Sequence, residues 1–247
     1  MPMGDISQIE DVDYIWNGEK YADLTGKTNH YDWVIASHVI EHTPDLISFI
    51  NDCDSILKED GVLFLAVPDR RYCFDYFRPA SSLSKVLDSH ELKLTRLSSG
   101  TLAEQGLYAA SLNGADSWQN ADGGGEFTLG NTTEDVLTQL QDDRERDYTD
   151  AHNWVFVPHS FRMMIEDLHQ MKLIALREAA FPESDDSYSY EFFAVLSRSG
   201  KGPGLSRIEM AKRMDEELLN PFSGKKQTVP INKRLRRLVR KGLRVFK

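Results

Sequence analysis

Two histidines and a glutamate lie within six residues, Ser37-His38-Val39-Ile40-Glu41-His42. An imidazole with an unperturbed pKa of about 6.5 can accept a proton near neutral pH. Such a group suits a direct displacement, in which an aligned hydroxyl or amine acceptor loses its proton to a base. We therefore predict His42 and His38 as catalytic residues. The alternative for His42 is a structural role, in which it caps or packs at the entrance of a helix.

The residues from His38 to His42 also match H-x-x-E-H, the inverted zinc-peptidase signature. That chemistry needs both histidines on one face of a continuous helix, together with a further ligand and a glutamate base. Thr43 can cap a helix and Pro44 suits its first position, so the helix is expected to begin after His42. The string then lies on a loop, and we predict no metal site.

A second group of polar side chains follows Pro68. The stretch from Asp69 to Pro79 is dense in aromatic and ionic residues and is too polar for a core strand. Arginine forks and an aromatic ring can hold an anionic or sugar-containing acceptor. We predict four substrate-binding residues: Arg70, Tyr72, Arg78 and His152. The alternative is an internal ion-pair network that holds this segment in place.

A β-α-β unit positions these groups. Tyr31 to Ser37 and Val62 to Val67 are short apolar runs, typical of buried parallel strands. Apolar residues recur between them at helical spacing: Leu46, Ile50, Cys53 and Leu57. Gly61 can end this helix in the left-handed conformation. The polar loop from Ser37 to His42 therefore lies at the carboxyl end of a strand, where open α/β sheets bind ligands.

The flanking segments are less regular. Before the unit we predict a strand over Val12 to Trp16, a turn at Asn17-Gly18 and one helical turn over Glu19 to Leu24. After it, Ser82 to Leu97 is expected to be helical. Residues 98–133 are poorly patterned and are expected to form a flexible surface loop.

The last part of the chain returns to an α/β pattern. Glu134 to Asp150 is expected to be an acidic, solvated helix. Ser160 can cap the helix that follows it. Leu173 to Phe181 and Tyr190 to Ser197 are two further strands, which a loop can connect in antiparallel fashion without a crossover helix.

Composition favours one soluble globular domain with an appendage, since the 247 residues are 40% hydrophobic and 28% charged. We assign residues 1–200 to an α/β domain, with 98–150 as an irregular, acidic insertion. Residues 201–247 are assigned to a linker and a basic amphipathic helical tail. From Lys225 onward the tail has no acidic residue, so it could dock on anionic lipid. A solvated tail is the alternative.

Charge and cysteine content limit the partners and the compartment. A net charge of -10 argues against nucleic acid as a partner, because binding phosphates needs a basic face. Cys53 and Cys73 form neither a metal spacing nor a disulfide framework, which favours a reducing compartment. The chain shows no signal peptide and no apolar run near the roughly 18 residues of a membrane span. We expect a cytoplasmic protein.

Three strings together resemble a bacterial subgroup of the class I S-adenosylmethionine (SAM) dependent methyltransferases of the type 11 kind: DWVIASHVIEHTPD, LAVPDRRYCFDYFRP and HNWVFVPHSF. The similarity covers about Ile9 to Arg198. It implies a Rossmann-like, seven-stranded sheet with helices on both faces. Tyr31 to Ser37 would be its fourth strand, Val62 to Val67 its fifth, and the last two predicted strands its sixth and seventh.

The resemblance also implies SAM as the cofactor. It places Ser37, His38 and Glu41 in the lining of the SAM pocket, and Asn17 and Gly18 near the adenine. Family members begin with a strand, a glycine-rich turn that approaches the methionine part of SAM, a helix, and a strand whose acidic end holds the ribose. None of this precedes Ile9, so the methyltransferase sheet is expected to be N-terminally incomplete.

Three explanations for the incomplete start remain open. The reading frame or assembly is incomplete, the protein is a remnant that no longer binds SAM, or another chain completes it. Without the missing strands, the edge of the Tyr31 to Ser37 strand would be exposed to aggregation or pairing. The isolated chain is therefore expected to be poorly soluble or oligomeric.

We predict a SAM-dependent methyltransferase that acts on a small-molecule or sugar-linked acceptor. The alternative is a non-catalytic, methyltransferase-like module that binds a protein partner or a membrane surface through the exposed strand edge and the basic tail. An in-frame, glycine-rich strand-turn segment encoded upstream would favour the enzyme.

Overall fold

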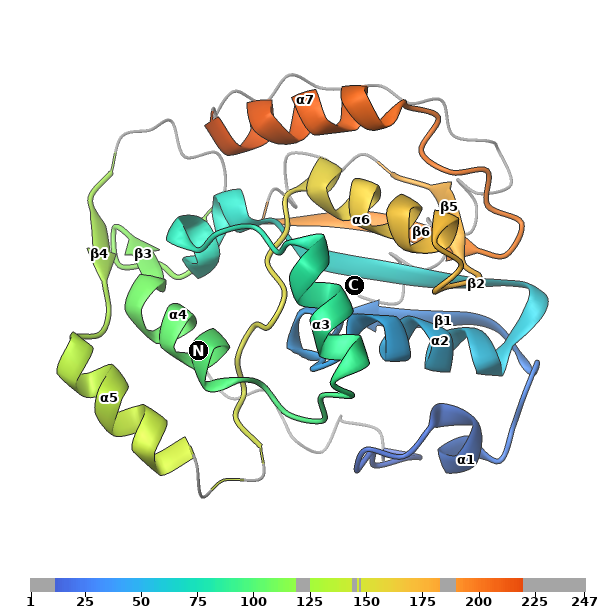
Figure 1. The fold of residues 1–247 in the computed structure, drawn as a ribbon, viewed down its shortest axis with the longest axis horizontal. Helices are drawn as coiled ribbons and strands as arrows, with labels where there is room; N and C mark the ends of the chain where they lie inside the picture. Colours follow the sequence, from blue (N-terminus) through green and yellow to red (C-terminus); the bar gives the residue numbers. More distant parts are fainter. Residues whose placement is uncertain (1–11, 119–124, 144–145, 147, 183–189, 220–247) are drawn as a thin grey trace.

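The computed structural model describes residues 12–118, 125–143, 146, 148–182 and 190–219 (Figure 1). Most of the predicted basic tail and most of the loop between the last two strands lie outside the described residues. The elements are α1 (Tyr21–Thr25), β1 (Tyr31–Ser37), η2 (Ile40–His42), α2 (Leu46–Ile56), β2 (Leu57–Pro68), η3 (Arg70–Tyr72), η4 (Phe74–Phe77), α3 (Leu83–Glu91), α4 (Ser99–Tyr108), β3 (Ala110–Leu112), β4 (Phe127–Leu129), α5 (Thr133–Asp142), α6 (Pro158–Gln170), β5 (Arg177–Ala180), β6 (Glu191–Ser197) and α7 (Arg207–Leu219).

Four strands form the main sheet, in the order β1-β2-β6-β5 (Figure 1). β1 pairs parallel with β2, and α2 connects them, so the predicted β-α-β unit is confirmed. β6 pairs antiparallel with both β2 and β5, which confirms the predicted antiparallel pair at the end of the chain. In the described residues the main sheet has these four strands, whereas the resemblance implies seven.

The helix between β1 and β2, α2, starts at Leu46, two residues later than predicted. Asp45 is its N-cap, because its carboxylate accepts hydrogen bonds from the backbone N–H and the hydroxyl of Ser48, at 3.0 and 2.7 Å. The predicted cap, Thr43, is wrong: its hydroxyl donates to the carbonyl of Ile40 instead. A carboxylate satisfies an otherwise unpaired N–H of the first turn and also favours the positive end of the helix dipole.

The N-cap at Asp45 is expected to stabilise α2. Asp45→Ala is expected to lower the free energy of unfolding by about 0.5–2 kcal/mol, because an N–H of α2 loses its partner. Asp45 also lies 2.9 Å from Nδ1 of His90, a contact that the substitution removes as well. Urea unfolding measures the loss. Asp88→Ala, at an exposed position of α3, is the control and is expected to stay within about 0.5 kcal/mol of wild type; equal losses in both variants would contradict the cap.

Gly61 does not end the helix as predicted. α2 ends at Ile56, and β2 begins at the next residue. Gly61 lies within β2, and a β-carbon built on it would lie 2.9 Å from the carbonyl oxygen of Lys58. The glycine is therefore needed for a close approach of backbone to backbone, which any side chain would obstruct.

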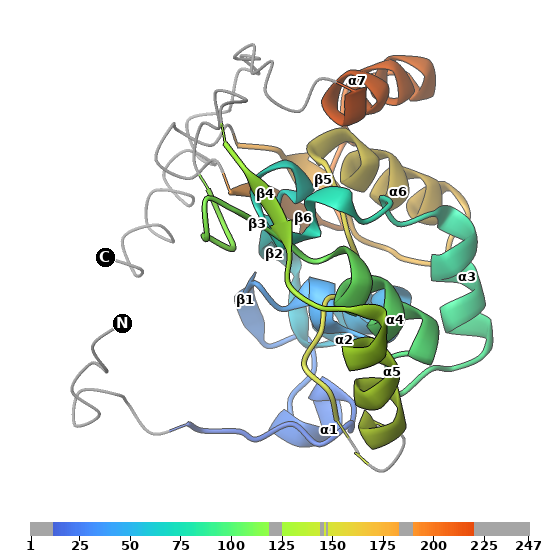
Figure 2. The same ribbon diagram turned by 90° about the vertical axis from the view of Figure 1, so that its left-hand side faces the viewer.

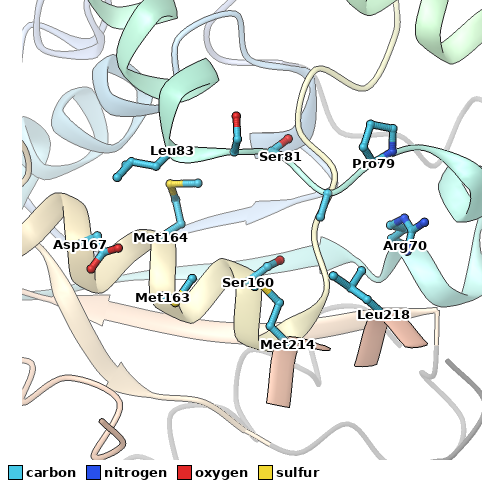
Figure 3. A pocket seen from close by; sticks show the side chains of 12 residues that line it. Arg70, Pro79, Ser81, Leu83, Ser160, Met163, Met164, Asp167, Met214 and Leu218 are labelled. Carbon is cyan, nitrogen blue, oxygen red and sulfur yellow. The ribbon is translucent and has the colours of Figure 1, made fainter. Parts of the chain in front are cut away.

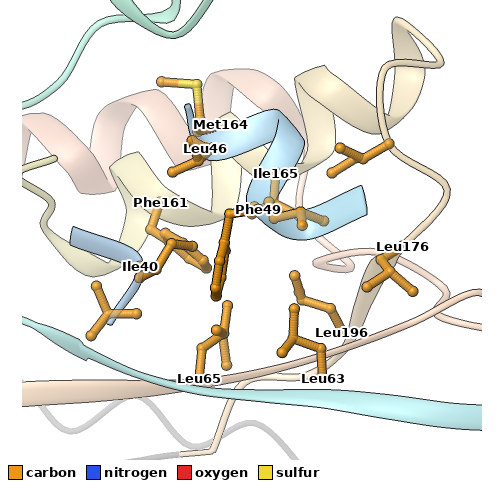
Figure 4. Packing of buried hydrophobic residues seen from close by; sticks show 14 of the residues in the cluster. Ile40, Leu46, Phe49, Leu63, Leu65, Phe161, Met164, Ile165, Leu176 and Leu196 are labelled. Carbon is orange, nitrogen blue, oxygen red and sulfur yellow. The ribbon is translucent and has the colours of Figure 1, made fainter. Parts of the chain in front are cut away.

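The main apolar core lies between one face of the sheet and helices α2 and α6 (Figure 4). Leu63 and Leu65 of β2 point toward Phe49 of α2 and Phe161 of α6, as expected for alternate residues of a strand with one face against helices. The opposite face carries a smaller cluster made of strand residues: Phe64, Ala66, Phe193 and Val195.

The prediction of helices on both faces is not met by the described residues. α2, α3 and α6 lie on one side of the sheet, α7 packs on α6 as a second layer, and no residue of a described helix belongs to the smaller cluster (Figures 1 and 2). Right-handed crossovers place their helices on the opposite face of a sheet when the next strand is added on the other side of the starting strand, here the free side of β1. The described residues contain no strand on that side of β1.

β1 is therefore an edge strand within the described sheet, and its Trp33 is 54% exposed. Open strand edges pair with other chains. We expect the purified protein to self-associate as its concentration rises, and Trp33→Lys to shift it toward monomer. Sedimentation velocity tests this, with Leu137→Lys on the exposed face of α5 as the control. A wild-type protein that stays monomeric at every concentration would contradict the prediction.

Residues 98–133 are more regular than the predicted surface loop. They contain α4 and an antiparallel pair, β3 and β4. Phe127 of β4 stacks on Tyr76, with ring centroids 4.7 Å apart, and its ring edge meets Trp118. Aromatic contacts between segments far apart in sequence thus order a stretch whose local pattern predicts no element. α5 follows where an acidic helix was expected, but it ends at Asp142.

Three further boundaries differ from the sequence-based expectations. Val12 to Trp16 forms no strand in the described residues, because β1 offers it no pairing. The following helical turn is confirmed as α1. α6 starts at Pro158, so Ser160 lies inside its first turn, where its hydroxyl accepts from the N–H of Val157 at 2.9 Å. The sequence did not predict α7.

No helix among the described residues is long and apolar enough to cross a membrane.

Candidate functional site

Three segments meet at the carboxyl edge of β1 and β2. β1 ends at Ser37, which is exposed and lies beside Ala66 in register. The residues after β2 leave the sheet at the same edge. Because β6 runs antiparallel to β2, its first residue, Glu191, pairs with Pro68 there. The predicted loop and the predicted polar segment are therefore neighbours, as expected at the ligand-binding edge of an open sheet.

A fourth segment reaches this edge from much later in the chain. The backbone N–H groups of Asn153 and Trp154 donate to the carbonyl of Glu41, at 2.6 and 3.1 Å. The side-chain amide of Asn153 also donates to the carbonyls of Thr43 and Pro44. These bonds fix the loop after β1 against residues 152–154 and bring His152 next to Glu41.

The carboxylate of Glu41 is the centre of the site. Glu41 is 1% exposed, and neither of its carboxylate oxygens accepts a hydrogen bond from a residue that the structure describes. Three imidazole nitrogens surround Oε1: Nδ1 of His38 at 3.5 Å, Nε2 of His42 at 3.8 Å and Nε2 of His152 at 4.0 Å. The rings of His42 and His152 meet edge to face, with centroids 4.8 Å apart.

Each of these histidines also contacts a second carboxylate through its other ring nitrogen. The pairs are His38 with Glu191 at 2.8 Å, His42 with Asp150 at 2.8 Å, and His152 with Asp75 at 2.5 Å. A carboxylate that holds one ring nitrogen orients the ring and sets which nitrogen faces the site. Hydrogen bonds hold His38 and His152 in this way, with the remaining nitrogen toward Glu41. Nδ1 of His42 makes no hydrogen bond with the described residues, although its Nε2 also lies toward Glu41.

His38 carries a positive charge at neutral pH. It has a φ of 52°, which is uncommon for a residue other than glycine. The hydrogen bond with Glu191, and then the carboxylate of Glu41 at 3.5 Å, raise the pKa of His38 to about 9, although partial burial opposes this. A protonated imidazole cannot accept a proton, so the raised pKa of His38 favours His42 of the two predicted bases.

The pKa of His38 can be tested directly. Glu191→Gln is expected to lower it toward its ordinary value of about 6.5, because the strongest hydrogen bond is lost. The folded pKa exceeds the unfolded one, so His38 contributes stability that is complete below pH about 6.5 and is lost as the pH rises through about 9. Titration of the ring by NMR measures the shift. Glu126→Gln, at an exposed position, is the control and should leave the pKa of His38 unchanged. An unchanged pKa in Glu191→Gln would contradict the role of Glu191.

Arg78 and His152, two predicted substrate-binding residues, belong to an internal network. Arg78 is fully buried, and its guanidinium lies 2.6 Å from Asp75 and donates to the carbonyl of His152 at 2.9 Å. Burial alone would raise the pKa of Asp75, but the bond from His152 and the charge of Arg78 lower it overall. These contacts favour the alternative of an ion-pair network, and they give Arg78 a positioning role behind His152.

Arg70 and Tyr72 lie nearer the surface. The Nε of Arg70 donates to the carbonyl of Arg78. Arg70 also lines a cavity of about 500 Å³ between α6, α7 and residues 79–83, whose other walls include Met164 and Met214 (Figure 3). No other predicted site residue lines this cavity. The guanidinium of Arg71 lies over the ring of Tyr72, 5.2 Å from its centroid.

Asn17 and Gly18 lie on the exposed segment before α1. The backbone N–H of Asn17 donates to the carboxylate of Glu19 at 2.7 Å, and Gly18 has a φ of 99°, which glycine adopts readily. Their place beside a cofactor stays a prediction.

Sequence reasoning missed the second carboxylates of the site. Glu191 could have been found, because the predicted antiparallel pairing puts the first residue of the last strand at this edge. Asp75 lies within the polar stretch already singled out. Asp150 carries no such signal, since it is one of many acidic residues in its segment, and only the fold places it beside His42.

The sheet and the polar edge define a Rossmann-like α/β protein. The family model of a methyltransferase domain matches residues 5–168, so the chain belongs to this family, as the resemblance implies. A search of curated proteins gave no match. A solved structure described as a Zn-dependent alcohol dehydrogenase from Rhodobacter sphaeroides is 13% identical, with a TM-score of 0.38 over 73% of this chain; the match spans 63% of that structure. That likeness is too weak to support a function.

Proposed function

We propose that this protein is a SAM-dependent methyltransferase that acts on a hydroxyl or amine of a small-molecule or sugar-linked acceptor. Family membership supports methyl transfer in general. The observation that carries the proposal is the position of the loop from Ser37 to His42 at the carboxyl end of β1, beside the polar segment after β2. SAM, when bound, supplies an electrophilic methyl group.

His42 is the proposed base. Its side chain is partly exposed, and the carboxylate of Asp150, 2.8 Å from Nδ1, would stabilise the positive charge that the ring gains on accepting a proton. The charged ring of His38 lies at the same edge and is suited to contact an anionic or polar group. Arg70 and Tyr72 are proposed to contact the acceptor, while His152 and Arg78 hold the wall behind it.

The described residues fit one side of a SAM site. Ser37 and His38 are exposed at the end of β1, with Glu41 buried behind them. In the family, a glycine-rich turn and an acidic strand end hold the methionine and ribose parts, on the far side of the strand that corresponds to β1. No described strand lies there. We therefore retain an N-terminally incomplete SAM site, with Asn17 and Gly18 near the adenine, as part of the proposal.

Calorimetric titration with SAM tests the proposal. The 247-residue chain is compared with a version extended by any in-frame sequence encoded upstream. Binding by both forms supports the enzyme and means that the residues of the 247-residue chain are enough to bind SAM. Binding by the extended form alone supports the enzyme and an incomplete site. Binding by neither form would overturn the proposal and favour a module that binds a protein partner or a membrane surface.

The charge of the chain bears on its compartment and partners. We propose a cytoplasmic protein with no nucleic-acid partner, given the net charge of -10. The tail from Lys225 onward is basic, and contact with anionic lipid remains a proposal for it. Co-sedimentation of the full chain with anionic and neutral vesicles distinguishes this from a solvated tail.

A further inference from the structure

We propose that Glu41, His42 and His152 form a binding site for a divalent transition-metal ion. One ligand atom from each of these side chains lies within 4.8 Å of the other two. No other group of three or more histidine, cysteine or acidic side chains gathers in this way among the residues that the structure describes. This inference does not depend on methyl transfer, and it goes beyond the function proposed above.

The carboxylate of Glu41 is buried and lacks hydrogen bonds from the described residues, which favours a bound cation. A buried carboxylate without hydrogen bonds costs several kcal/mol unless a positive charge compensates it. Both oxygens of Glu41 lack a hydrogen bond from the described residues, and the backbone carbonyl is held by the N–H groups of Asn153 and Trp154. The ring of His38, 3.5 Å from Oε1, compensates part of this cost without a hydrogen bond. The carboxylate is therefore fixed in a buried position where a bound cation would coordinate its oxygens directly.

The carboxylates of Asp75 and Asp150 lie beside the other ring nitrogens of His152 and His42. Metal-binding histidines almost always hold their other ring nitrogen against a carboxylate, a backbone carbonyl or water, which fixes the ring and makes the ligand nitrogen more basic. His152 makes this contact through a hydrogen bond between Nδ1 and Asp75. Nδ1 of His42 lies 2.8 Å from Asp150 but makes no hydrogen bond with the described residues. In both residues Nε2 is the nitrogen nearer Glu41. The ring of His152 is thus held as a ligand, and His42 faces the same carboxylate.

Distances indicate how the site would close on an ion. Ligand atoms about 2.0–2.2 Å from a tetrahedral ion are about 3.4 Å from each other. Nε2 of His42 and Nε2 of His152 lie 3.8 and 4.0 Å from Oε1 of Glu41, so each needs to approach the carboxylate by about half an ångström. The three ligand atoms lie within 4.8 Å of one another, so the largest approach needed between any two is about 1.4 Å. His42 is only partly buried, which leaves access for an ion.

The ligand set selects the class of ion. Imidazole nitrogens suit Zn²⁺, Co²⁺ and Fe²⁺, whereas Mg²⁺ and Ca²⁺ prefer oxygen ligands throughout. Three protein ligands would leave a position open for water or for a substrate oxygen. This site also differs from the H-x-x-E-H pattern, which would pair His42 with His38. The second imidazole comes instead from His152, and Nε2 of His38 is held by Glu191.

A bound ion would change the role of His42. Its Nε2 cannot bind an ion and accept a proton at the same time. In the ion-bound protein, an acceptor hydroxyl in the open position would be acidified by coordination. Metal binding can nevertheless be measured without any acceptor or SAM, so its failure and the failure of the proposed function are distinguishable.

The test is calorimetric titration of the chelator-treated, full-length chain with Zn²⁺. We expect one ion per chain, a Kd in the micromolar range or below, and a rise in Tm on binding. Glu41→Gln keeps the shape of the side chain and is expected to raise Kd at least tenfold. Asp150→Asn, at a position 72% exposed, removes the negative charge 2.8 Å from Nδ1 of His42 and is expected to weaken binding less than Glu41→Gln does. The visible spectrum of bound Co²⁺ reports its coordination independently of heat.

His159→Gln is the matched control. Nδ1 of His159 lies 2.6 Å from Glu217, so this residue is another buried histidine paired with a carboxylate, but it belongs to no cluster of ligands. We expect its affinity for Zn²⁺ to equal that of wild type. Circular dichroism of each ion-free variant checks that it is folded. The proposal is overturned if wild type binds Zn²⁺ no more tightly than millimolar, or if folded Glu41→Gln binds as tightly as wild type.

Discussion

Arg78→Met is expected to lower the free energy of unfolding by about 3–5 kcal/mol, because it leaves the carboxylate of Asp75 buried without its charged partner. The guanidinium of Arg78 is fully buried and contacts Asp75, the carbonyl of His152 and the side chain of Gln105. Methionine fills much of the same space but supplies none of these hydrogen bonds.

Denaturant unfolding followed by circular dichroism measures this loss. Arg207→Met is the control, since Arg207 is 70% exposed and pairs with Asp167 at the surface of α7. Surface pairs of this kind contribute about 0–1 kcal/mol. A loss at Arg78 no larger than at Arg207 would mean that the network around Asp75 does not hold the site together.

The pH dependence of stability gives a second measure of the same pair. The pKa of Asp75 is lowered in the folded protein, so its ionisation contributes stability that is present above its unfolded pKa of about 3.9 and is lost as the pH falls through the folded value. In Arg78→Met the folded pKa of Asp75 is expected to rise, so acid destabilisation should begin at a higher pH than in wild type.

His42→Ala is expected to lower the rate of methyl transfer by about 10²–10⁴-fold, the usual contribution of a positioned base. Binding of SAM should stay within a few-fold of wild type, because His42 acts on the acceptor. The measurement is formation of S-adenosylhomocysteine with an acceptor found by screening. His159→Gln, in the first turn of α6 and outside the cluster around Glu41, is the control and should retain its rate.

The same variant separates the base from the structural alternative for His42. If His42 only packs at the entrance of α2, its removal should lower Tm while the rate per folded molecule stays near that of wild type. A rate within threefold of wild type would contradict the catalytic role. Loss of both SAM binding and folding would assign His42 to the structure of the loop.

The fold could be predicted where local pattern and tertiary structure agree. The apolar runs of β1 and β2, and the stripe led by Leu46 and Ile50, are periodic enough to identify the β-α-β unit and the site at its carboxyl edge. Boundaries were less accurate, because several residues compete for one cap. Thr43 and Asp45 can both serve, and the backbone geometry before α2 selects Asp45. The order within residues 98–133 depends on rings such as Tyr76, which lie far away in sequence.

The site could be predicted in its parts but not in its arrangement. The side chains of His42, Glu41 and His152 were all singled out from their types and positions. Sequence separation gives no indication that His152 would lie beside Glu41, and it does not distinguish a guanidinium that contacts substrate from one that is fully buried, as Arg78 is. These distinctions depend on burial and on contacts between distant segments.

The hydrogen bonds from Asn153 and Trp154 to the carbonyl of Glu41 bear on the order of folding. They join residues separated by more than a hundred positions, and closing so long a loop costs entropy that only later contacts repay. The β-α-β unit can form from local contacts, but His152 reaches Glu41 only when the segments that hold it, around Asp75 and Gln105, have also assembled. A partly folded chain therefore has the loop without the site, and any activity of this edge reports a completely folded protein.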